Sequence, residues 1–294
     1  MSQIKRVLIV GGTHGNELTG VYTTKKFERH PVLIDRPSFE TFTLIGNPNA
    51  VAAGTRYIDH DLNRCFNFKE LEEQLRCGYE VQRAKDIFDQ FGQTGSLPID
   101  LIIDQHSTTS NAGVMLILDQ LDTFSLNLAA YLSSIQPTLN VYSSANSGRS
   151  QDSLRSLAKH RVGIEIGPIA HGTLHAELFQ KNEALVYAIL DYVEQYNTHG
   201  IELEKSSLPL YQYVVAVDYP RNSEGEIFAM IHPQLQFQDY KPLNPGDPLF
   251  LTFDGEVITY QGDFLAFPVF INEAAYYEKA IAMCLAEKQN IGIS

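Results

Sequence analysis

Short apolar runs alternate with longer amphipathic stretches along the first two-thirds of the chain. The apolar runs have the length and composition of buried strands, and they are Arg6–Val10, Phe42–Ile45, Leu101–Asp104, Val114–Leu118 and Val162–Ile166. Apolar residues recur at helical spacing between or after these runs, over Glu17–Glu28, Tyr79–Phe91, Phe124–Ser134 and Leu178–Gln195. This alternation predicts an α/β fold in which helices cover both faces of a sheet.

The pattern changes near Gly200. Beyond this residue the chain is rich in proline, glycine and short β-like runs, which are Tyr211–Val217, Leu249–Thr252 and Pro268–Ile271. Turn-forming sequences such as Asn244-Pro245-Gly246-Asp247 recur between the runs. We therefore predict a larger domain over residues 1–199 and a smaller, β-rich domain over residues 200–294.

The composition is that of an ordinary globular protein. Of the 294 residues, 44% are hydrophobic and 19% are charged, and no apolar run is long enough to cross a bilayer. The N-terminus leads directly into the first predicted strand, without room for a signal peptide, and the three cysteines have unrelated spacings. These features favour a cytoplasmic location without a membrane partner. The net charge of −13 argues against nucleic acid as a partner, and an anionic substrate would need a local basic pocket.

Two polar side chains follow the first predicted strand. The strand ends in two glycines, which permit a sharp turn, and His14 and Glu17 come directly afterwards. Because ligands bind at the carboxyl edge of open α/β sheets, this position favours a functional site. The alternative interpretation is a polar loop in which Glu17 caps the following helix.

A third candidate metal ligand, His106, ends another buried run and is expected at the same sheet edge. Catalytic zinc usually has three protein ligands and an open position for water, so two imidazoles and one carboxylate suit a mononuclear zinc hydrolase. His60, His171 and His175 are rival ligands, but Gly172 makes a helical pair of the last two unfavourable. Surface or locally satisfied positions are the preferred interpretation of these three histidines.

Seven motifs occur in order along nearly the whole chain. They are GGTHGNELTG (Gly11–Gly20), TRYIDHDLNR (Thr55–Arg64), DQHSTTSN (Asp104–Asn111), GIEIGP (Gly163–Pro168), DYPRNSEGEI (Asp218–Ile227), HPQLQFQDYKPLNPGDP (His232–Pro248) and PVFINEAAYYEK (Pro268–Lys279). With His14, Glu17 and His106, they resemble the aspartoacylase family of zinc carboxypeptidase-like hydrolases. The resemblance implies a carboxypeptidase-like mixed sheet flanked by helices, followed by a β-rich domain that narrows the entrance to the active site. It also implies that these three residues bind one zinc ion per chain.

Glu165 is a charged residue inside an otherwise apolar predicted strand. A buried charge is costly without a partner or a function, so the residue alone is equally compatible with an ion pair and with catalysis. Amide hydrolysis needs a group that takes a proton from water and gives one to the leaving amine. The resemblance assigns this general acid/base role to Glu165.

The stretch RYIDHDLNR begins and ends with an arginine. A guanidinium stays charged and presents a planar set of donors, so it can stabilise an oxyanion or hold a carboxylate. The resemblance implies that Arg56 polarises the scissile carbonyl together with zinc, and that Asn63 and Arg64 bind a substrate carboxylate. The composition alone is also compatible with a charged surface loop. We expect Asp59 and Asp61 to brace the arginines, because the metal ligand set is already complete.

Arg155 is the residue that bears most on substrate identity. It matches the family arginine that holds the second carboxylate of an acylated aspartate, and the sister group acting on acylated aromatic amino acids lacks it. Without the resemblance, a solvated arginine on a helix face would be the favoured interpretation. The resemblance also makes Tyr276 a substrate-binding residue and indicates that Glu273 orders its loop. Gln151 and Ser107 depart from the family pattern, where the animal aspartoacylases have tyrosine and asparagine.

Together these features predict a zinc amidohydrolase that converts an N-acyl-L-aspartate, most simply N-acetyl-L-aspartate, to aspartate and a carboxylate. The alternatives are a deacylase for N-acyl aromatic or other neutral amino acids and a non-catalytic, zinc-dependent binding protein. Zinc with Arg56, Arg64 and Arg155 is expected to concentrate positive potential in one pocket despite the acidic net charge. The expected partner is a small molecule, and a homo-oligomer is left open.

Overall fold

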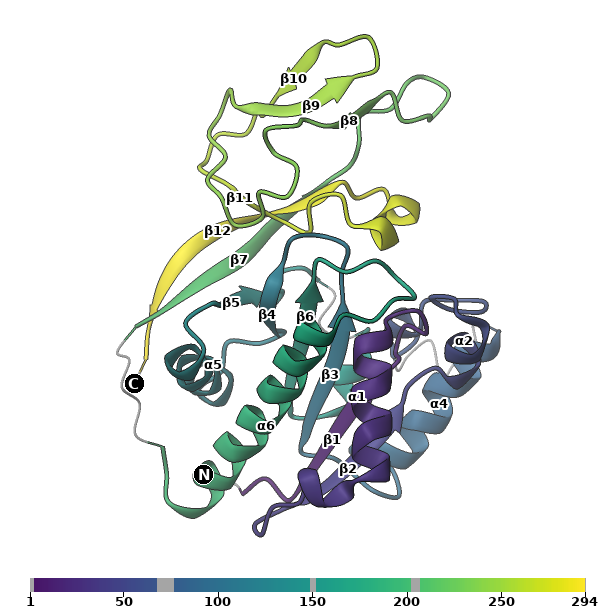
Figure 1. Cartoon of the computed structure of the whole chain (residues 1–294), viewed down its shortest axis with the longest axis vertical. Coiled ribbons are helices and arrows are strands. Elements are labelled where there is room, and N and C mark those ends of the chain that lie inside the picture. The colour runs from purple at the N-terminus through teal and green to yellow at the C-terminus, as the bar shows by residue number, and fades with distance from the viewer. Residues whose placement is uncertain (1–2, 68–76, 149–151, 202–206, 294) are drawn as a thin grey trace.

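The structure is a computed structural model that describes residues 3–67, 77–148, 152–201 and 207–293. Gln151 lies outside the described residues. The main feature is a nine-stranded sheet (Figure 1). Its strands, in order across the sheet, are β11 (Phe267–Val269), β12 (Met283–Gly292), β7 (Ser207–Val217), β5 (Leu139–Ser143), β4 (Gly113–Leu118), β6 (His160–Gly167), β3 (Leu101–Ser107), β1 (Arg6–Gly11) and β2 (Glu40–Ile45).

The sheet is mixed. Strands β2, β1, β3 and β6 run parallel to one another, and β4 is antiparallel to β6. Strand β5 is parallel to β4 and to β7, whereas β12 is antiparallel to β7 and to β11. The carboxyl ends of β1, β3 and β6 therefore lie side by side at one edge of the sheet, which is where parallel sheets bind ligands.

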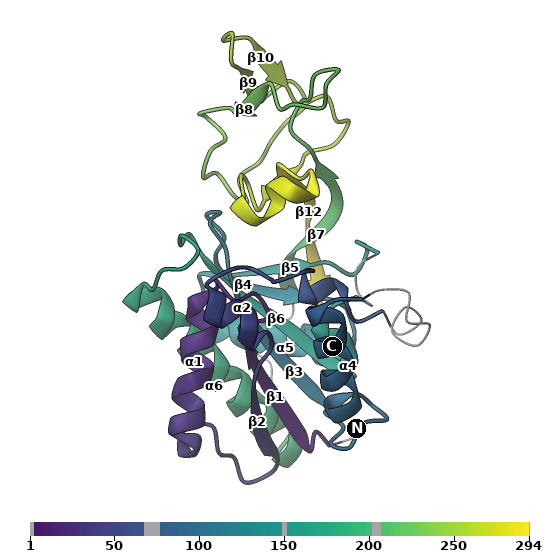
Figure 2. The ribbon, with the colours of Figure 1, turned by 90° about the vertical axis from the view of Figure 1, so that its right-hand side faces the viewer.

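Helices cover both faces of the sheet (Figure 2). On one face lie α1 (Leu18–Arg29), α5 (Thr123–Ile135) and α6 (Ala176–Thr198), and on the other lie α4 (Tyr79–Phe91) and the short helices η2 (Leu62–Arg64) and η3 (Leu154–Leu157). Side chains alternate between the two faces of a strand, and in β1 both sets are apolar. Val7 and Ile9 are buried in the core on the first face, and Leu8 and Val10 in the core on the second, so both faces need a cover of helices. Two further short helices, η1 (Pro31–Leu33) and α2 (Pro48–Ala53), lie on either side of β2 in the sequence.

The part of the chain beyond residue 206 both extends the large sheet and forms a small one. Strands β8 (Ala229–Ile231), β9 (Pro248–Thr252) and β10 (Val257–Thr259) make a separate antiparallel sheet with its own apolar core. The short helix η4 (Ala274–Lys279) precedes β12. Because β7 pairs with β5, the large sheet continues through both predicted domains (Figure 1). The division at residue 200 stays a prediction.

The predicted fold class is confirmed, and the four helices and five strands expected in the first two-thirds are present within a few residues of their predicted bounds. Two strands of the large sheet, β5 and β12, were not predicted. Strand β5 has only five residues, and β12 is buried over its first four residues but exposed at Glu287 and Lys288, so neither gives a clear periodic pattern. Within the described part of the chain, every helix is too short or too polar to cross a membrane.

Candidate active site

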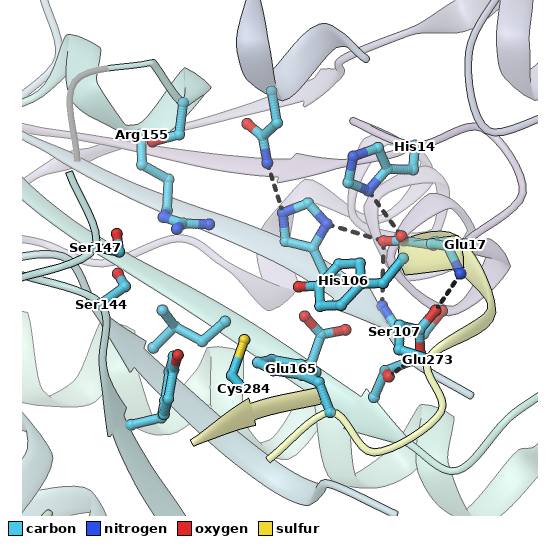
Figure 3. A pocket seen from close by; sticks show the side chains of 18 of the residues that line it. His14, Glu17, His106, Ser107, Ser144, Ser147, Arg155, Glu165, Glu273 and Cys284 are labelled. Atoms are coloured by element: carbon cyan, nitrogen blue, oxygen red, sulfur yellow. Dashed lines mark hydrogen bonds and ion pairs between the residues drawn. The ribbon is translucent and has the colours of Figure 1, made fainter. Parts of the chain in front are cut away.

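All nine residues predicted to form the site line one cavity of about 120 Å³ at the carboxyl edge of the sheet. Figure 3 shows part of this lining. The nine residues are His14, Glu17, Arg56, Asn63, Arg64, His106, Arg155, Glu165 and Tyr276. The first eight come from the predicted larger domain, and Tyr276 comes from η4. The structure therefore brings together residues that are up to 262 positions apart in the sequence, although their individual roles stay predictions.

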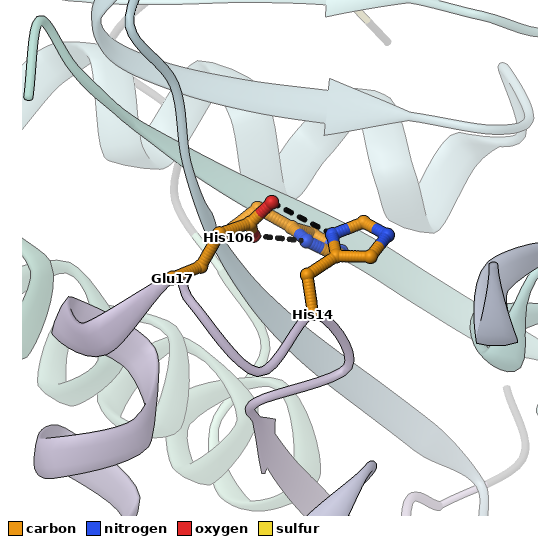
Figure 4. Close-up of side chains that lie close together, drawn as sticks. All are labelled: His14, Glu17 and His106. Carbon is orange, nitrogen blue, oxygen red and sulfur yellow. Dashed lines mark hydrogen bonds and ion pairs between the residues drawn. The ribbon is translucent and has the colours of Figure 1, made fainter. Parts of the chain in front are cut away.

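Three of these residues form a buried cluster that can hold a metal ion (Figure 4). One ligand atom from each of His14, Glu17 and His106 lies within 4.8 Å of the others, and all three side chains are buried. Nδ1 of His14 is 2.7 Å from Glu17 Oε1, and Nδ1 of His106 is 2.9 Å from Glu17 Oε2. Both imidazoles thus turn the same nitrogen towards one carboxylate.

The backbone at the ends of β1 and β3 sets this arrangement. Gly12 directly follows β1 with a φ of 68°, which favours glycine and turns the chain towards His14. Glu17 is at the N-cap position of α1, but its side chain makes no capping hydrogen bond, so the alternative of a capping loop is wrong. Strand β3 continues beyond Asp104 to Ser107, so His106 lies at its carboxyl end, where it was expected to finish the buried run.

The far nitrogen of each histidine contacts another carboxylate. Nε2 of His14 is 3.0 Å from Asp61 Oδ1, and Nε2 of His106 is 2.7 Å from Asp104 Oδ2. Carboxylates in this position fix the tautomer of metal-binding histidines and leave Nδ1 as the ligand. Although Nδ1 of His14 is close to Glu17, the geometry is not that of a hydrogen bond, and this buried atom is left without a hydrogen-bonding partner. A cation between this nitrogen and the Glu17 carboxylate would give the nitrogen a partner, so the cluster is suited to binding a cation.

The charge state of Glu17 suits this interpretation. Burial alone would raise the pKa of the carboxyl group, but the charges of His14 and His106 and the hydrogen bond with His106 hold the pKa well below its ordinary value. Glu17 is therefore ionised, as a carboxylate ligand must be.

The prediction that two aspartates brace the arginines is confirmed for Asp61, which pairs with Arg56, and wrong for Asp59. Asp59 accepts a hydrogen bond from the backbone N–H of Tyr79, at the start of α4, and contacts no arginine in the described residues. Asp61 lies 3.7 Å from Arg56, but it is closer to His14 and to the Nζ atom of Lys279. A sequence motif shows that charges are near one another along the chain, but not which of them the fold pairs.

Glu165 points its carboxyl group towards the side of the cavity formed by His106 and Glu17 (Figure 3). The side chain is on β6 directly beside His106 on β3, since these two residues are partners in the sheet. Burial raises the pKa of Glu165 to about 8, against the lowering effect of His106. Among the described residues Glu165 has no ion-pair partner, so the alternative of a buried ion pair is wrong for that part of the chain.

Arg155 is buried on η3, which excludes the alternative of a solvated arginine on a helix face. Its Nε and Nη2 atoms donate to the two carboxylate oxygens of Asp119 at 2.8 and 2.9 Å, and Nη1 lies 3.5 Å from Asp104. Although burial alone would lower it, the pKa of Arg155 is raised because Asp119 and Asp104 stabilise the charged form. Figure 3 shows its side chain extending into the cavity.

The stretch from Arg56 to Arg64 is not a charged surface loop, because its key side chains enter the cavity. Nη1 of Arg56 donates to Glu17 Oε1 at 2.9 Å. Asn63 is buried, with Oδ1 accepting from the backbone of Leu154 at 3.0 Å and Nδ2 lying 3.4 Å from His106 Nε2. Arg64 donates to the backbone oxygen of Asn63 at 2.5 Å.

Helix η4 brings Tyr276 into the cavity, and Glu273 holds that helix in place. One oxygen of Glu273 accepts hydrogen bonds from the hydroxyl and backbone N–H groups of Thr109, at 2.9 and 2.7 Å, and from the hydroxyl of Thr108. The other oxygen accepts from the backbone N–H of Ala275 at the start of η4. These contacts agree with the expectation that Glu273 orders its loop.

The rival histidines have other local partners. Nε2 of His60 is 3.0 Å from the backbone oxygen of Cys77, and Nε2 of His171 is 3.3 Å from Glu273. Nδ1 of His175 accepts from the backbone of Leu178 and caps α6. None of the three belongs to the metal cluster found in the described residues.

Sequence reasoning missed three charged residues of the site region. Asp104 and Asp119 are buried, and each is paired with a positively charged or protonatable side chain of the cavity. Lys279 pairs with Asp61. We expected positive charge to be concentrated in the cavity. The structure shows that this charge is partly balanced, because Arg56, Arg155 and Lys279 all have carboxylate partners. An acidic residue at the end of a buried strand, as at Asp119, was the available signal.

Replacing His106 with alanine should lower metal affinity by at least about 100-fold, because two ligands remain and loss of an outer partner alone costs 10–100-fold. Zinc content after dialysis and amide hydrolysis should fall together. His60→Ala is the matched control, since His60 is exposed and outside the cluster. A His106→Ala protein that retains one zinc per chain and full activity would exclude this ligand set.

Comparison with known proteins identifies the class of enzyme. A family model described as the succinylglutamate desuccinylase/aspartoacylase catalytic domain matches residues 3–193, and one described as the AstE/AspA barrel-sandwich hybrid domain matches residues 206–288. The chain is 53% identical to a probable aspartoacylase of Nostoc sp., with all of both chains covered. With fold and cavity, these matches define an amidohydrolase. The chain belongs to the succinylglutamate desuccinylase/aspartoacylase family, as the motifs indicated.

Two mouse relatives with different names are similarly close. The chain is 42% identical to mouse aspartoacylase, covering 97% of this chain and 93% of that protein. It is 39% identical to the mouse N-acyl-aromatic-L-amino acid amidohydrolase (carboxylate-forming), covering 98% and 92%. The solved structure of murine aminoacylase 3 superposes with a TM-score of 0.92 at 38% identity, covering 100% of this chain and 98% of that one. Overall sequence similarity therefore does not decide which N-acyl amino acid is the substrate.

Proposed function

We propose that this amidohydrolase cleaves the amide bond of N-acyl-L-aspartate, most simply N-acetyl-L-aspartate, and uses one zinc ion per chain. The observation that carries the proposal is the position of Arg155, a buried guanidinium in the lining of the cavity that also contains the metal cluster. A buried cation with donors directed into a cavity suits a carboxylate, and a substrate with a second carboxylate is the simplest match.

The metal site supports hydrolysis. His14, Glu17 and His106 would hold the zinc ion, which, when bound, makes water more acidic and polarises a carbonyl oxygen. Two imidazole nitrogens and a carboxylate oxygen are ligands that zinc prefers. Asp61 and Asp104 hold the imidazoles in the required tautomer.

The remaining side chains supply the proton transfer and the binding. A cation held by His14, Glu17 and His106 would favour the ionised form of the neighbouring Glu165. The Glu165 carboxylate would then accept a proton from water and later deliver it to the leaving amine. Arg56 stabilises negative charge on the carbonyl oxygen. Arg64, Asn63 and Tyr276 hold the α-carboxylate of the substrate, which leaves Arg155 for the side-chain carboxylate.

Two alternatives are less well supported. A deacylase for aromatic or neutral amino acids has no need of a buried arginine at the position of Arg155. A zinc-dependent binding protein without catalysis has no need of Glu165. Burying an ionisable group that has no ion-pair partner in the described chain is costly, so its presence beside the metal cluster favours a catalytic role. A cytoplasmic location and the oligomeric state stay predictions.

A release assay with acetylated aspartate, glutamate, tyrosine and phenylalanine tests the proposal. The zinc-loaded enzyme should have its highest kcat/KM for acetyl-aspartate, and removal of zinc by a chelator should abolish turnover. A higher kcat/KM for acetyl-tyrosine would support the aromatic alternative. Zinc binding without turnover of any substrate would support the binding protein.

A further inference from the structure

The guanidinium of Arg155 is held on one side by Asp119. Nε and Nη2 each donate to a different oxygen of this carboxylate, at 2.8 and 2.9 Å, so the pair is bidentate. Asp119 is itself buried and held by the hydroxyl of Ser144, which donates to Oδ1 at 2.8 Å. Ser144 is in turn tied to β4, because its backbone N–H donates to the oxygen of Leu118 at 2.9 Å. The carboxylate is therefore a rigid partner.

The guanidinium is also in close contact with Gly163 of β6. A Cβ atom at this glycine would lie 2.9 Å from Nη1 of Arg155, 3.2 Å from its Cζ, and 3.3 Å from the Cβ of Ile117. A flexible arginine could move away from such an atom, but the two hydrogen bonds to Asp119 restrain this one. Glycine at position 163 therefore leaves room for the guanidinium to lie against the strand.

We infer that Asp119 and Gly163 are positioning residues that determine specificity for an acidic side chain, an inference that rests on the proposed function of Arg155. A guanidinium has five N–H donors, and Asp119 takes two of them along one edge. The end formed by Nη1 and Nη2 keeps donors for a substrate carboxylate, in the paired geometry that arginine favours. Because Asp119 and Gly163 both restrain the guanidinium, its Nη1 and Nη2 atoms are fixed in position. The distance from the metal cluster to these two atoms then selects the length of the substrate side chain.

The first test is Asp119→Asn, which preserves shape but offers an amide N–H group to the guanidinium in place of one oxygen. We expect the KM for acetyl-aspartate to rise about tenfold or more, with kcat and the kcat/KM for acetyl-tyrosine changed less than about threefold, since small misplacements of a binding group have large effects. Adding Asp119→Asn to Arg155→Ala should not change kcat/KM for either substrate any further, because no guanidinium remains to be positioned. Asp263→Asn, at an exposed position, is the matched control.

A second variant keeps the inference testable if Asp119→Asn folds poorly. Gly163→Ala retains both charges and should displace the guanidinium, with the same selective loss for acetyl-aspartate. Melting temperatures identify variants that are merely unstable. Equal losses for both substrates in folded variants, or an unchanged ratio, would overturn the inference while leaving the proposed function intact. The wild-type ratio tests the proposed function separately: a wild type that does not prefer acetyl-aspartate overturns both.

Discussion

Replacing Glu165 with glutamine should lower kcat by about 100-fold or more, while zinc content and KM stay close to the wild-type values. Glutamine has the size of glutamate and can form hydrogen bonds, but it cannot take a proton from water or deliver one to an amine. The proposed metal ligands are other side chains, so their geometry should be unaffected. Steady-state kinetics with acetyl-aspartate and metal analysis of the same preparations give the two measurements.

The stability of this variant separates a catalytic effect from misfolding. Burial raises the pKa of Glu165 to about 8, so the charged form is disfavoured in the folded protein, and a neutral glutamine should not lower the melting temperature. Glu256→Gln, at an exposed position, is the matched control. If kcat of Glu165→Gln stays within a few-fold of the wild type, another group is the base.

Replacing Arg155 with alanine should lower kcat/KM for acetyl-aspartate by at least about 30-fold, because the loss of a buried partner leaves a substrate carboxylate unpaired at a cost of about 2–5 kcal/mol. Acetylated neutral amino acids should lose far less, since they have no side-chain carboxylate. The quantity to compare is the ratio of kcat/KM for acetyl-aspartate to that for acetyl-tyrosine, in the wild type and in the variant.

The Arg155→Ala protein also needs controls, because it leaves the carboxylates of Asp119 and Asp104 buried without their cation. Arg155→Lys retains the charge without the bidentate geometry and should give an intermediate ratio. Arg221→Ala removes an exposed arginine and should leave kcat/KM unchanged for both substrates. An unchanged ratio in a folded Arg155→Ala protein would remove the basis for the aspartate assignment.

Much of the fold was predictable because the strands that carry the site are buried on both faces. Strands β1, β3 and β6 each contain a short apolar run, and a polar residue inside or directly after such a run is conspicuous. The strands near the C-terminus were harder to predict, because β12 is partly exposed and its polar residues interrupt the pattern. Sequence periodicity reports burial, so it detects a strand only where the fold buries it.

The candidate site was predictable as a set of residues but not as a set of contacts. His14, Glu17 and His106 could be chosen because metal binding requires particular side chains at strand ends. The partners of Arg155 could not be chosen in this way, because Asp119 is 36 positions away and its pairing depends on how β4 and η3 are placed in the fold. Ion pairs between distant segments leave no local signal in a sequence.

The place of β6 in the sheet has a consequence for how the chain folds. This strand lies between β3 and β4, both of which precede it in the sequence, so a nascent chain that has not reached His160 has two unpaired strand edges at the centre of its sheet. Such edges promote aggregation until they are paired. Insertion of β6 removes both edges and places Glu165 beside His106. The step that protects the growing chain is thus the same step that completes the edge of the sheet that lines the cavity.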